Sequence, residues 1–471
     1  MFENSLVCRI FTSISAWFEN QFDNSDIIQG FLKKNDKIET SKGSLVFKIY
    51  VFIRALFMKI FMFLRFDKLF ENSIFKISFL WCSAAVIFAP VLPTKFIIIL
   101  ALAGFGSLFL EFISDKEKQL KYFAINKYII FYAFAYGISI ITSVNPSGSL
   151  FGGLLTVMFV MFFFVVINSI TTRKQLDTLV FFMVSIGVLV SLYGFYQYMF
   201  PSKYSGVWHD TTMFESISFR VYSTLDNPNV LGEYFLLIVP ISFAYFIISK
   251  NYLAKLFYLG STGVMMLCLI LTLSRGCYIG IMVAMCMFLV MYDKRFIILA
   301  IIGLMMLPML LPETIIERFM SIGNMEDSST SYRVYIYMGT LAMLKDYWFS
   351  GIGPGETAFN MVYPSYAYNG ISAPHSHNLF LQIITDTGVC GLIIFVSIIY
   401  QYYKQVFRTI LIEKDKEYRT LAIGGCCAIT GFFIQSLFDY SFYNYRVMIL
   451  FWIVLGISLL FTDLSSMEAK R

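Results

Sequence analysis

Apolar stretches of roughly twenty residues recur along most of the chain and are separated by shorter polar segments. An α-helix rises about 1.5 Å per residue, so about 20 apolar residues cross the roughly 30 Å of hydrocarbon in a bilayer. The pattern therefore predicts about twelve membrane-spanning helices. We expect them at about 74–89, 96–112, 128–142, 150–167, 179–199, 231–248, 256–273, 277–292, 296–311, 379–400, 421–437 and 448–461.

Composition agrees with this pattern. Of the 471 residues, 58% are hydrophobic and 14% are charged, and the mean hydropathy is +0.71. Such a chain has too few polar side chains to cover the surface of a soluble globule. We therefore predict an all-α polytopic membrane protein, with a transmembrane domain over 74–461 and a short cytoplasmic tail over 462–471.

The first 73 residues form a separate extension. They do not resemble a cleaved signal peptide, because no apolar core is followed by a small-residue cleavage site. The apolar segment 46–66 carries Lys48, Arg54, Lys59 and Arg65, which at about 100° per residue fall within an arc of about 140°. This one-sided basic stripe predicts a helix lying in the inner membrane surface. The alternative, a thirteenth span, would bury four cations.

Basic residues indicate the orientation of the spans. The loops on one side, together with the C-terminal tail, hold 17 Lys and Arg residues, and the loops on the other side hold 8. By the positive-inside rule, the first side is cytoplasmic and both termini lie there. We expect a multi-pass protein of the cytoplasmic membrane.

Two outer segments, about 201–229 and 312–376, are longer than plain connectors. Loops of the second length are usually functional or disordered, and this one is not of low complexity. Within it, the run Ser328-Ser-Thr-Ser predicts the start of a helix over about 332–347, with Arg333 in its first turn. The sequence Gly351-Ile-Gly-Pro-Gly355 then breaks the chain. We expect one large helical extracytoplasmic loop.

Candidate chemistry lies at the outer ends of the spans. Ser274-Arg275-Gly276 separates two apolar stretches, and His375-Ser-His377-Asn378 stands immediately before another, with two of the three histidines of the chain. Charged groups at a membrane boundary are costly and usually mark a site. The cysteines show no CxxC or CxxH spacing, so they predict no metal site.

The order of these elements resembles the O-antigen ligase/polymerase superfamily, membrane glycosyltransferases that act on polyprenyl-diphosphate-linked sugars. The resemblance covers roughly residue 74 to the C-terminus and implies a GT-C-like fold. The pieces that carry it are Arg220 with Asn227-Pro-Asn229, Leu273-Ser-Arg-Gly276, Arg333, Asp346 with Gly351-Ile-Gly-Pro-Gly355, and His377-Asn378 separated by nine residues from Gly388-Val-Cys-Gly391.

The same residues support this chemistry directly. A transferase outside the cytoplasm needs a donor that arrives activated, and arginine clamps a lipid diphosphate through paired N–H donors. We expect Arg220, Arg275 and Arg333 to converge on the diphosphate, with the helix amides near Arg333 adding to the site. His377 is the candidate general base for the acceptor hydroxyl, because imidazole exchanges protons near neutral pH. We expect inversion at the anomeric centre.

Other predictions concern supporting groups and cofactors. The outer loops contain no Asp-x-Asp pair to hold a divalent ion, so we expect no metal and no cofactor, with the arginines stabilising the leaving group. Asn378, Asp386, His375 and Arg446 are candidate supporting residues. Expected partners are a polyprenyl (undecaprenyl) diphosphate-linked oligosaccharide, a glycan acceptor and the bilayer, with a flippase and a chain-length regulator left open, and no nucleic acid.

The sequence leaves three functions open. The favoured one is a polymerase of lipid-linked repeat units of a cell-surface polysaccharide, because the outer loop is moderate in length and the cytoplasmic extension is unusual. A ligase would pass the finished glycan to a terminal acceptor. A transporter or flippase fits twelve spans, but the charges gather at one face instead of forming a path across the membrane.

Overall fold

The computed structural model describes residues 77–114, 120–121, 123–201, 219–296 and 327–464, with the single positions Leu56, Lys59, Ile316, Met320, Gly323, Asn324 and Met467. This part of the chain is helical and contains no strand. The predicted interfacial helix at 46–66 and nearly all of the expected span at 296–311 lie outside the described residues. Both remain predictions.

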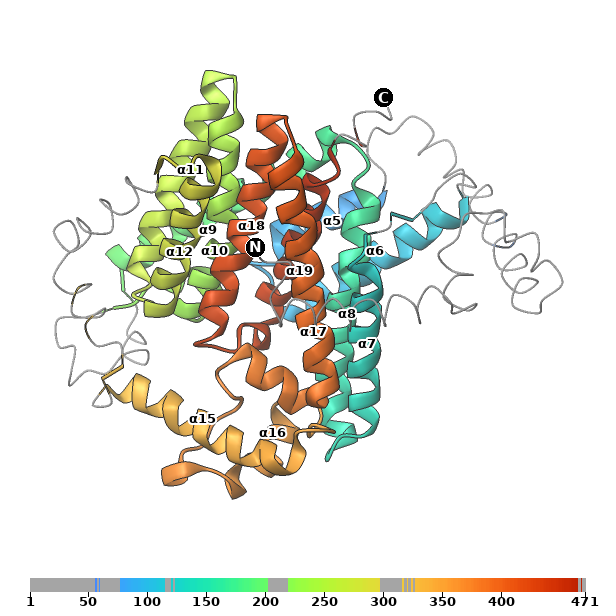
Figure 1. The fold of residues 1–471 in the computed structure, drawn as a ribbon, viewed down its shortest axis with the longest axis vertical. Helices are drawn as coiled ribbons and strands as arrows, with labels where there is room; N and C mark the ends of the chain where they lie inside the picture. Colours follow the sequence, from blue (N-terminus) through green and yellow to red (C-terminus); the bar gives the residue numbers. More distant parts are fainter. Residues whose placement is uncertain are drawn as a thin grey trace.

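Each of the other eleven predicted spans contains a helix. Among the described residues, seven helices are long and apolar enough to cross a membrane by length and composition, and three others are apolar but shorter. The described part of the chain is thus all-helical and of a multi-pass membrane type, while the number of twelve spans stays a prediction. The helices of the bundle (Figure 1) are α5 (Ile77–Phe88), α6 (Thr94–Ser114), α7 (Asn126–Ile141), α8 (Pro146–Ser169), α9 (Arg173–Met199), α10 (Pro228–Ile248), α11 (Tyr252–Leu271), α12 (Arg275–Tyr292), α17 (Leu379–Ile412), α18 (Lys416–Ser436) and α19 (Tyr445–Phe461).

Helix α10 forms the centre of the bundle, and it is buried on every side from Val230 to Ile241. Helix α18 packs against both α10 and α12. Its approach to α12 depends on two small residues, because a Cβ atom on Gly280 would lie 2.7 Å from the carbonyl oxygen of Gly431. A polar residue on α10, such as Glu233, is therefore enclosed by protein.

Helix α17 is broken at Gly388, where φ is +68°. The segment that follows α15 supplies the backbone hydrogen bonds that the break removes: Ile352 N–H donates to Thr385 O at 2.7 Å, and Val389 N–H donates to Trp348 O at 2.8 Å. The glycine-rich sequence was expected only to break the chain. It also forms hydrogen bonds with the backbone at the break in α17. The irregular backbone beside the apolar spans therefore has hydrogen-bond partners within the protein.

The long outer loop forms a small helical layer at one end of the bundle (Figure 1). It contains α15 (Ser328–Tyr347), α16 (Glu356–Val362) and the 3-10 turns η5 (Tyr363–Ser365) and η6 (Tyr368–Gly370). Side chains such as Ile336, Met343 and Phe359 form its own core. Two further turns at this end, η4 (Ser223–Leu225) and η7 (Ser441–Tyr443), connect bundle helices.

The predicted start of the loop helix was wrong. Helix α15 begins at Ser328, four residues before the expected start, and its N-cap is Asp327, whose side chain accepts from Ser329 N–H at 3.4 Å. Arg333 therefore lies in the second turn. The amides of the helix N-terminus are next to Asp327, so they do not add to an anion site at Arg333 in the way expected.

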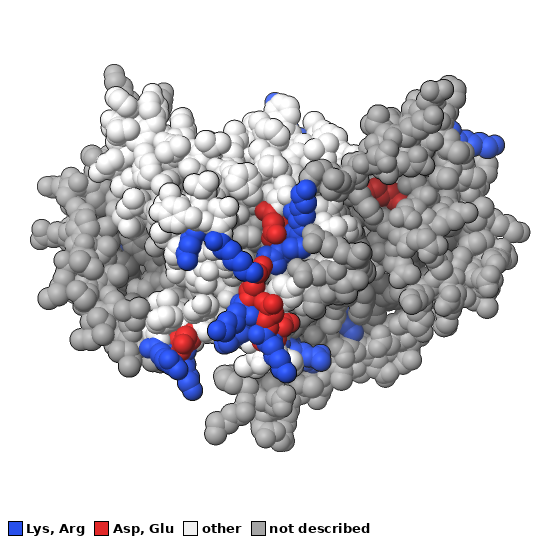
Figure 2. All heavy atoms as spheres, turned by 90° about the horizontal axis from the view of Figure 1, so that it is seen from above, with Lys and Arg blue, Asp and Glu red and all other residues white. Residues whose placement is uncertain are grey.

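Charged side chains mark the end of the bundle away from α15. Seen from that end (Figure 2), Lys, Arg, Asp and Glu gather in one band across the described surface. Acidic and basic side chains lie next to one another within it. The band provides a surface of mixed charge that contrasts with the buried polar groups at the other end.

Candidate active site

His377 and Asp439 form a hydrogen-bonded pair, which we call the histidine pair, at the α15 end of the bundle. Nδ1 of His377 lies 3.1 Å from Oδ1 of Asp439, and the two side chains are 19% and 3% exposed. His377 precedes α17, and Asp439 follows α18. Two segments separated by 62 residues thus bring an imidazole and a carboxylate together.

The backbone holds His377 in an unusual conformation. Its φ of +50° lies in the left-handed region, which non-glycine residues adopt at a cost. The next residue, Asn378, caps α17 by accepting from Phe380 N–H and donates its own side-chain N–H to Leu437 O at 2.8 Å. Tyr337 of α15 donates to His377 O at 2.9 Å. Asn378 thus fixes the backbone around His377, and its role as a supporting residue stays a prediction.

Asp439 is a carboxylate that fixes the histidine tautomer. Burial opposes its ionisation, but the hydrogen bond from His377 and the charge of Arg333 outweigh burial, so the pKa of Asp439 lies below its ordinary value. A carboxylate can only accept a hydrogen bond, so Nδ1 of His377 carries the hydrogen toward it. The lone pair of a neutral His377 is then on Nε2, which is the arrangement of a general base.

Arg220 reaches this pair through Asn229. The Arg220 guanidinium donates to Asn229 Oδ1 at 3.1 Å and, through Nε, to Thr272 O at 2.9 Å. Asn229 in turn donates to Asp439 Oδ2 at 3.2 Å. The chain of bonds links two predicted motifs, Asn227-Pro-Asn229 and the segment before Arg275. It places Arg220, which is only 8% exposed, behind the histidine pair.

Arg275 and Arg333 have different surroundings. Arg275 forms an ion pair of 2.5 Å with Asp327, a fully buried carboxylate. Burial would raise the pKa of Asp327, but the hydrogen bond from Thr330 and the charge of Arg275 lower it below its usual value. Arg333 donates to Ser329 Oγ at 2.6 Å and has no carboxylate partner among the residues that the structure describes. Its Nε is buried without a hydrogen-bond partner.

The charge of Arg333 acts on the histidine pair itself. It lowers the pKa of Asp439 and also contributes to the low pKa of His375. Arg333 therefore lies near both groups, although it forms no hydrogen bond with either in the described part of the chain. The structure brings Arg333 close to His377, while Arg275 is tied to the start of α15.

His375 packs beside His377 as a neutral ring. Burial and the neighbouring His377 lower the pKa of His375 to about 3. Its ring stacks on Tyr443 at a centroid distance of 4.9 Å, and its Nδ1 accepts from His377 N–H at 3.3 Å. His375 thus lies against His377 as a neighbour, and its supporting role stays a prediction.

The two remaining supporting candidates lie in separate networks. Arg446 pairs with Asp226 at 2.5 Å and donates to Thr224 O, so it fixes the loop before α10. Asp386 is buried on α17, where it accepts from Gln382 at 2.8 Å and from Tyr136 at 3.3 Å. No hydrogen bond or ion pair described in the structure connects either residue to His377.

One group of side chains has the composition of a metal site. His375, His377 and Asp439 each offer one ligand atom, and these atoms lie within 4.8 Å of one another. Two imidazoles and a carboxylate are ligands that Zn²⁺ accepts. Sequence spacing did not predict this group, because Asp439 lies 62 residues after His377 in the chain.

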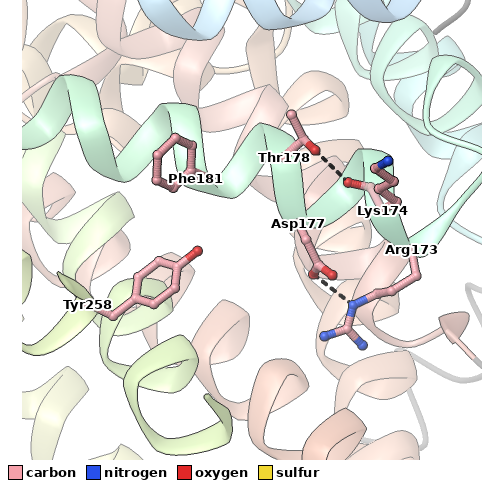
Figure 3. Close-up of a pocket in the computed structure, with 6 residues that line it drawn as sticks. All are labelled: Arg173, Lys174, Asp177, Thr178, Phe181 and Tyr258. Carbon is pink, nitrogen blue, oxygen red and sulfur yellow. Dashed lines mark hydrogen bonds and ion pairs between the residues drawn. The ribbon is translucent and has the colours of Figure 1, made fainter. Parts of the chain in front are cut away.

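A separate cavity lies at the N-terminal end of α9 (Figure 3). It has a volume of about 420 Å³ and is lined by Arg173, Lys174, Asp177, Thr178, Phe181 and Tyr258. Arg173 bonds to Asp177 and to Glu417, each at 2.7 Å. The predicted site residues are absent from its lining, and the histidine pair lies at the opposite end of the bundle helices, so this cavity is not the candidate active site.

The sequence did not single out Asp439, Asn229 or Asp327 as site residues. Asn229 appears there only as part of the motif Asn227-Pro-Asn229. A carboxylate that follows a predicted span directly was the one available signal for Asp439. Its partner could not be identified from spacing along the chain.

Comparison with known families agrees with the resemblance. Residues 260–396 match the family model described as O-antigen ligase. The matched region includes Arg275, Arg333 and His377, while Arg220 and Asp439 lie outside it. No curated protein matches the chain. The family match confirms the predicted resemblance.

Proposed function

We propose, from its place in the O-antigen ligase/polymerase superfamily, that this protein is a membrane glycosyltransferase that polymerises lipid-linked repeat units of a cell-surface polysaccharide. The observation that carries the proposal is the His377–Asp439 pair with Arg333 beside it. The pair provides a base for a sugar hydroxyl, and the arginine provides positive charge for a diphosphate. Donor and acceptor chemistry therefore meet at one end of the bundle.

The donor in this proposal is a polyprenyl diphosphate that carries the growing glycan. Arg333 is the first candidate for its phosphates, since its Nε lacks a partner and no described carboxylate neutralises it. Arg275 is held by Asp327 and contributes a fixed positive charge, and Arg220 contributes through the Asn229 link. Arginine stabilises the charge that develops on the departing diphosphate.

The acceptor is a sugar hydroxyl that loses its proton to Nε2 of His377. As the hydroxyl oxygen bonds to the anomeric carbon, the bond from that carbon to the diphosphate oxygen breaks, and the lipid diphosphate leaves with the electron pair. Attack from the opposite face inverts the anomeric centre. Asp439 stabilises the imidazolium that forms, and the proton then passes to water.

We keep the mechanism metal-free, because Asp439 Oδ1 already holds Nδ1 of His377 and the arginines supply positive charge. His375, His377 and Asp439 still fit a metal by composition. A chelator added to the purified enzyme distinguishes the two: turnover should continue at the same rate. Loss of turnover that Zn²⁺ restores would replace the metal-free proposal.

The decisive assay mixes purified protein with polyprenyl-diphosphate oligosaccharide and follows product length. A polymerase lengthens the lipid-linked glycan in steps and gives a ladder. A ligase leaves donor length unchanged and transfers the glycan only when a separate acceptor is added. Transport of the lipid-linked donor across vesicles without any new glycosidic bond would favour the flippase alternative.

We also propose that the α15 end faces away from the cytoplasm and that both termini are cytoplasmic. The support is the excess of Lys and Arg in the loops of the opposite side. A reporter fused between Gly323 and Thr330 should report the external side, and one at 414–416 the cytoplasm. Both reporters on the same side would overturn this orientation.

A further inference from the structure

Glu233 is a buried carboxyl group directly behind the histidine pair. It lies on α10, one helical turn after Asn229, and is 0% exposed. Its Oε1 accepts from Gln435 Nε2 at 3.2 Å and from Ser441 Oγ at 2.9 Å. Its Oε2 is buried without a hydrogen-bond partner.

Gln435 also has a buried side-chain oxygen without a hydrogen-bond partner. Its amide nitrogen bonds to Glu233, but its amide oxygen, Oε1, is also buried without a partner. Two buried acceptors on adjoining groups thus lack a donor. A buried acceptor without a donor destabilises the folded state. A single hydrogen atom on Glu233 Oε2 satisfies both, because a carboxylic acid and an amide form a ring of two hydrogen bonds.

We propose that Glu233 is a neutral carboxylic acid that pairs with the Gln435 amide and so positions Asp439 for the His377 base. The catalytic part of this inference rests on the proposed function. The protonation of Glu233 and its pairing stand on the hydrogen-bond pattern alone.

The two partners of Glu233 enclose Asp439 in the sequence. Gln435 lies in the last turn of α18, and its carbonyl accepts from Asp439 N–H at 3.2 Å, while Ser441 lies two residues after Asp439. Asn229, on the same face of α10 as Glu233, bonds to the Asp439 side chain. One turn of α10 therefore holds the segment before Asp439, the segment after it and the carboxylate itself.

A neutral Glu233 also sets the charge of the site. Asp439 and Glu233 interact electrostatically across this network, so a second negative charge would oppose the ionisation of Asp439. The other titratable groups that face Glu233 are Cys277 on α12 and Tyr443 in η7. With Glu233 protonated, Asp439 carries the negative charge that neutralises the His377 imidazolium.

This pairing gives a reason for Gly276 in the motif Ser274-Arg275-Gly276. A Cβ atom at position 276 would overlap Oε1 of Gln435, the atom that receives the proposed hydrogen bond. Glycine leaves room for the amide beside the backbone of α12. The motif thus serves two functions, because Arg275 supplies charge and Gly276 admits the Gln435 side chain.

Infrared difference spectroscopy of the purified protein tests the protonation. The wild-type spectrum minus that of Glu233→Gln should contain the C=O stretch of a protonated carboxyl group at neutral pH, with a shift in D₂O. Asp386→Asn is the matched control, since Asp386 is a second buried carboxyl group bonded to other partners. The wild-type spectrum minus that of Asp386→Asn must not contain the band assigned to Glu233. A difference that contains only carboxylate bands would overturn the proposal.

Enzyme kinetics test the positioning role. Glutamine at 233 keeps the acceptor for Gln435 and offers an N–H to its amide oxygen, so Glu233→Gln should keep most of the turnover and the wild-type pH profile. Glu233→Leu and Gln435→Leu should each lower kcat by about tenfold or more, with little change in the KM for the donor. A shifted pH profile in Glu233→Gln, or wild-type kcat in both leucine variants, would refute the role.

Failure of the proposed function gives a different result. If the wild-type protein forms no glycosidic bond, the transferase assignment fails, while the infrared band still reports whether Glu233 is protonated.

Discussion

Arg173 and Arg333 lie near opposite ends of the bundle, and their hydrogen-bond and ion-pair partners differ. Arg173 begins α9 and bonds to Asp177 at 2.7 Å (Figure 3). It also bonds to Glu417 at 2.7 Å. Arg333 lies in the second turn of α15 and bonds to Ser329, with no described carboxylate partner. The first arginine is neutralised within the fold, and the second is not.

The comparison indicates which charges hold the structure and which are available to a ligand. The acidic partners of Arg173 are 39% and 35% exposed, so solvent screens that cluster. Near Arg333 the carboxylate is Asp439, which is 3% exposed and already bonded to His377. Arg333 is half-buried, with a buried Nε and no described counterion, and such an arginine favours an anion from outside, such as a diphosphate. The predictions below test this difference, beginning with the largest effect.

The histidine pair should show the largest effect. His377→Ala should lower turnover by about 10²–10⁴, because the acceptor hydroxyl loses its base. Asp439→Asn should also lower kcat strongly, since an amide no longer fixes the hydrogen on Nδ1, while His375→Ala should be much milder. Steady-state kinetics of purified variants measure this. Wild-type turnover in His377→Ala would remove the base assignment, and loss of donor binding in both histidine variants would move His377 to the phosphate site.

The two arginines should then separate under the same substitution. Arg333→Lys should lower kcat/KM by about one to two decades, because lysine keeps the charge but loses the planar pair of N–H donors. Arg173→Lys is the matched control and should leave turnover unchanged. Arg275→Lys should also lose activity while the protein still accumulates in the membrane. Equal, unchanged activity in all three variants would assign the arginines to structure alone.

His375 should make the stability of the site end depend on pH. Its pKa is about 3 in the folded protein and ordinarily about 6.5, so the unfolded chain binds the proton first as pH falls. The stability it contributes is present above pH 6.5 and declines between pH 6.5 and 3, by about 1.4 kcal/mol per pH unit. Thermal unfolding of His375→Gln should be less pH-dependent in that window. An unchanged pH dependence would contradict the burial argument.

The Arg173 cluster should give the smallest effect. Glu417→Gln removes one of the two ion pairs of Arg173. Both of its carboxylate partners are more than a third exposed. We expect a loss of less than about 1 kcal/mol in stability and no change in turnover. Melting temperature and kcat of the purified variant measure both. A large loss of activity would show that this end takes part in the reaction.

The fold was largely predictable, because hydrocarbon imposes a simple requirement on the sequence. Apolar runs of spanning length correspond to helices such as α8 and α10 within a few residues. The glycine-rich sequence after Asp346 was predicted to break the chain, but its pairing with the break in α17 was not. Hydrogen bonds between Ile352 and Thr385 join segments more than thirty residues apart, and a local pattern contains no information on that contact.

The candidate site was predictable in composition and incomplete in its connections. Arg220, Arg275, Arg333 and His377 were chosen because ionisable groups at a membrane boundary are expensive. Their separate surroundings were not visible: Arg275 has a counterion in Asp327, whereas Arg333 has none among the described residues. The predicted start of α15 was too late, because Asp327 is the N-cap and the serine run belongs to the first turn of the helix.

The sequence by itself determined that the chain is helical, apolar along its spans and supplied with arginines and histidines near their outer ends, because each of these properties depends on residue type and local spacing. The tertiary structure decided which groups touch. The bond from His377 to Asp439, the link from Arg220 through Asn229, and the enclosure of Glu233 all depend on how α10, α17 and α18 pack. Hydrogen bonds act over about 3 Å, so only the folded chain can assign a partner to a buried polar group.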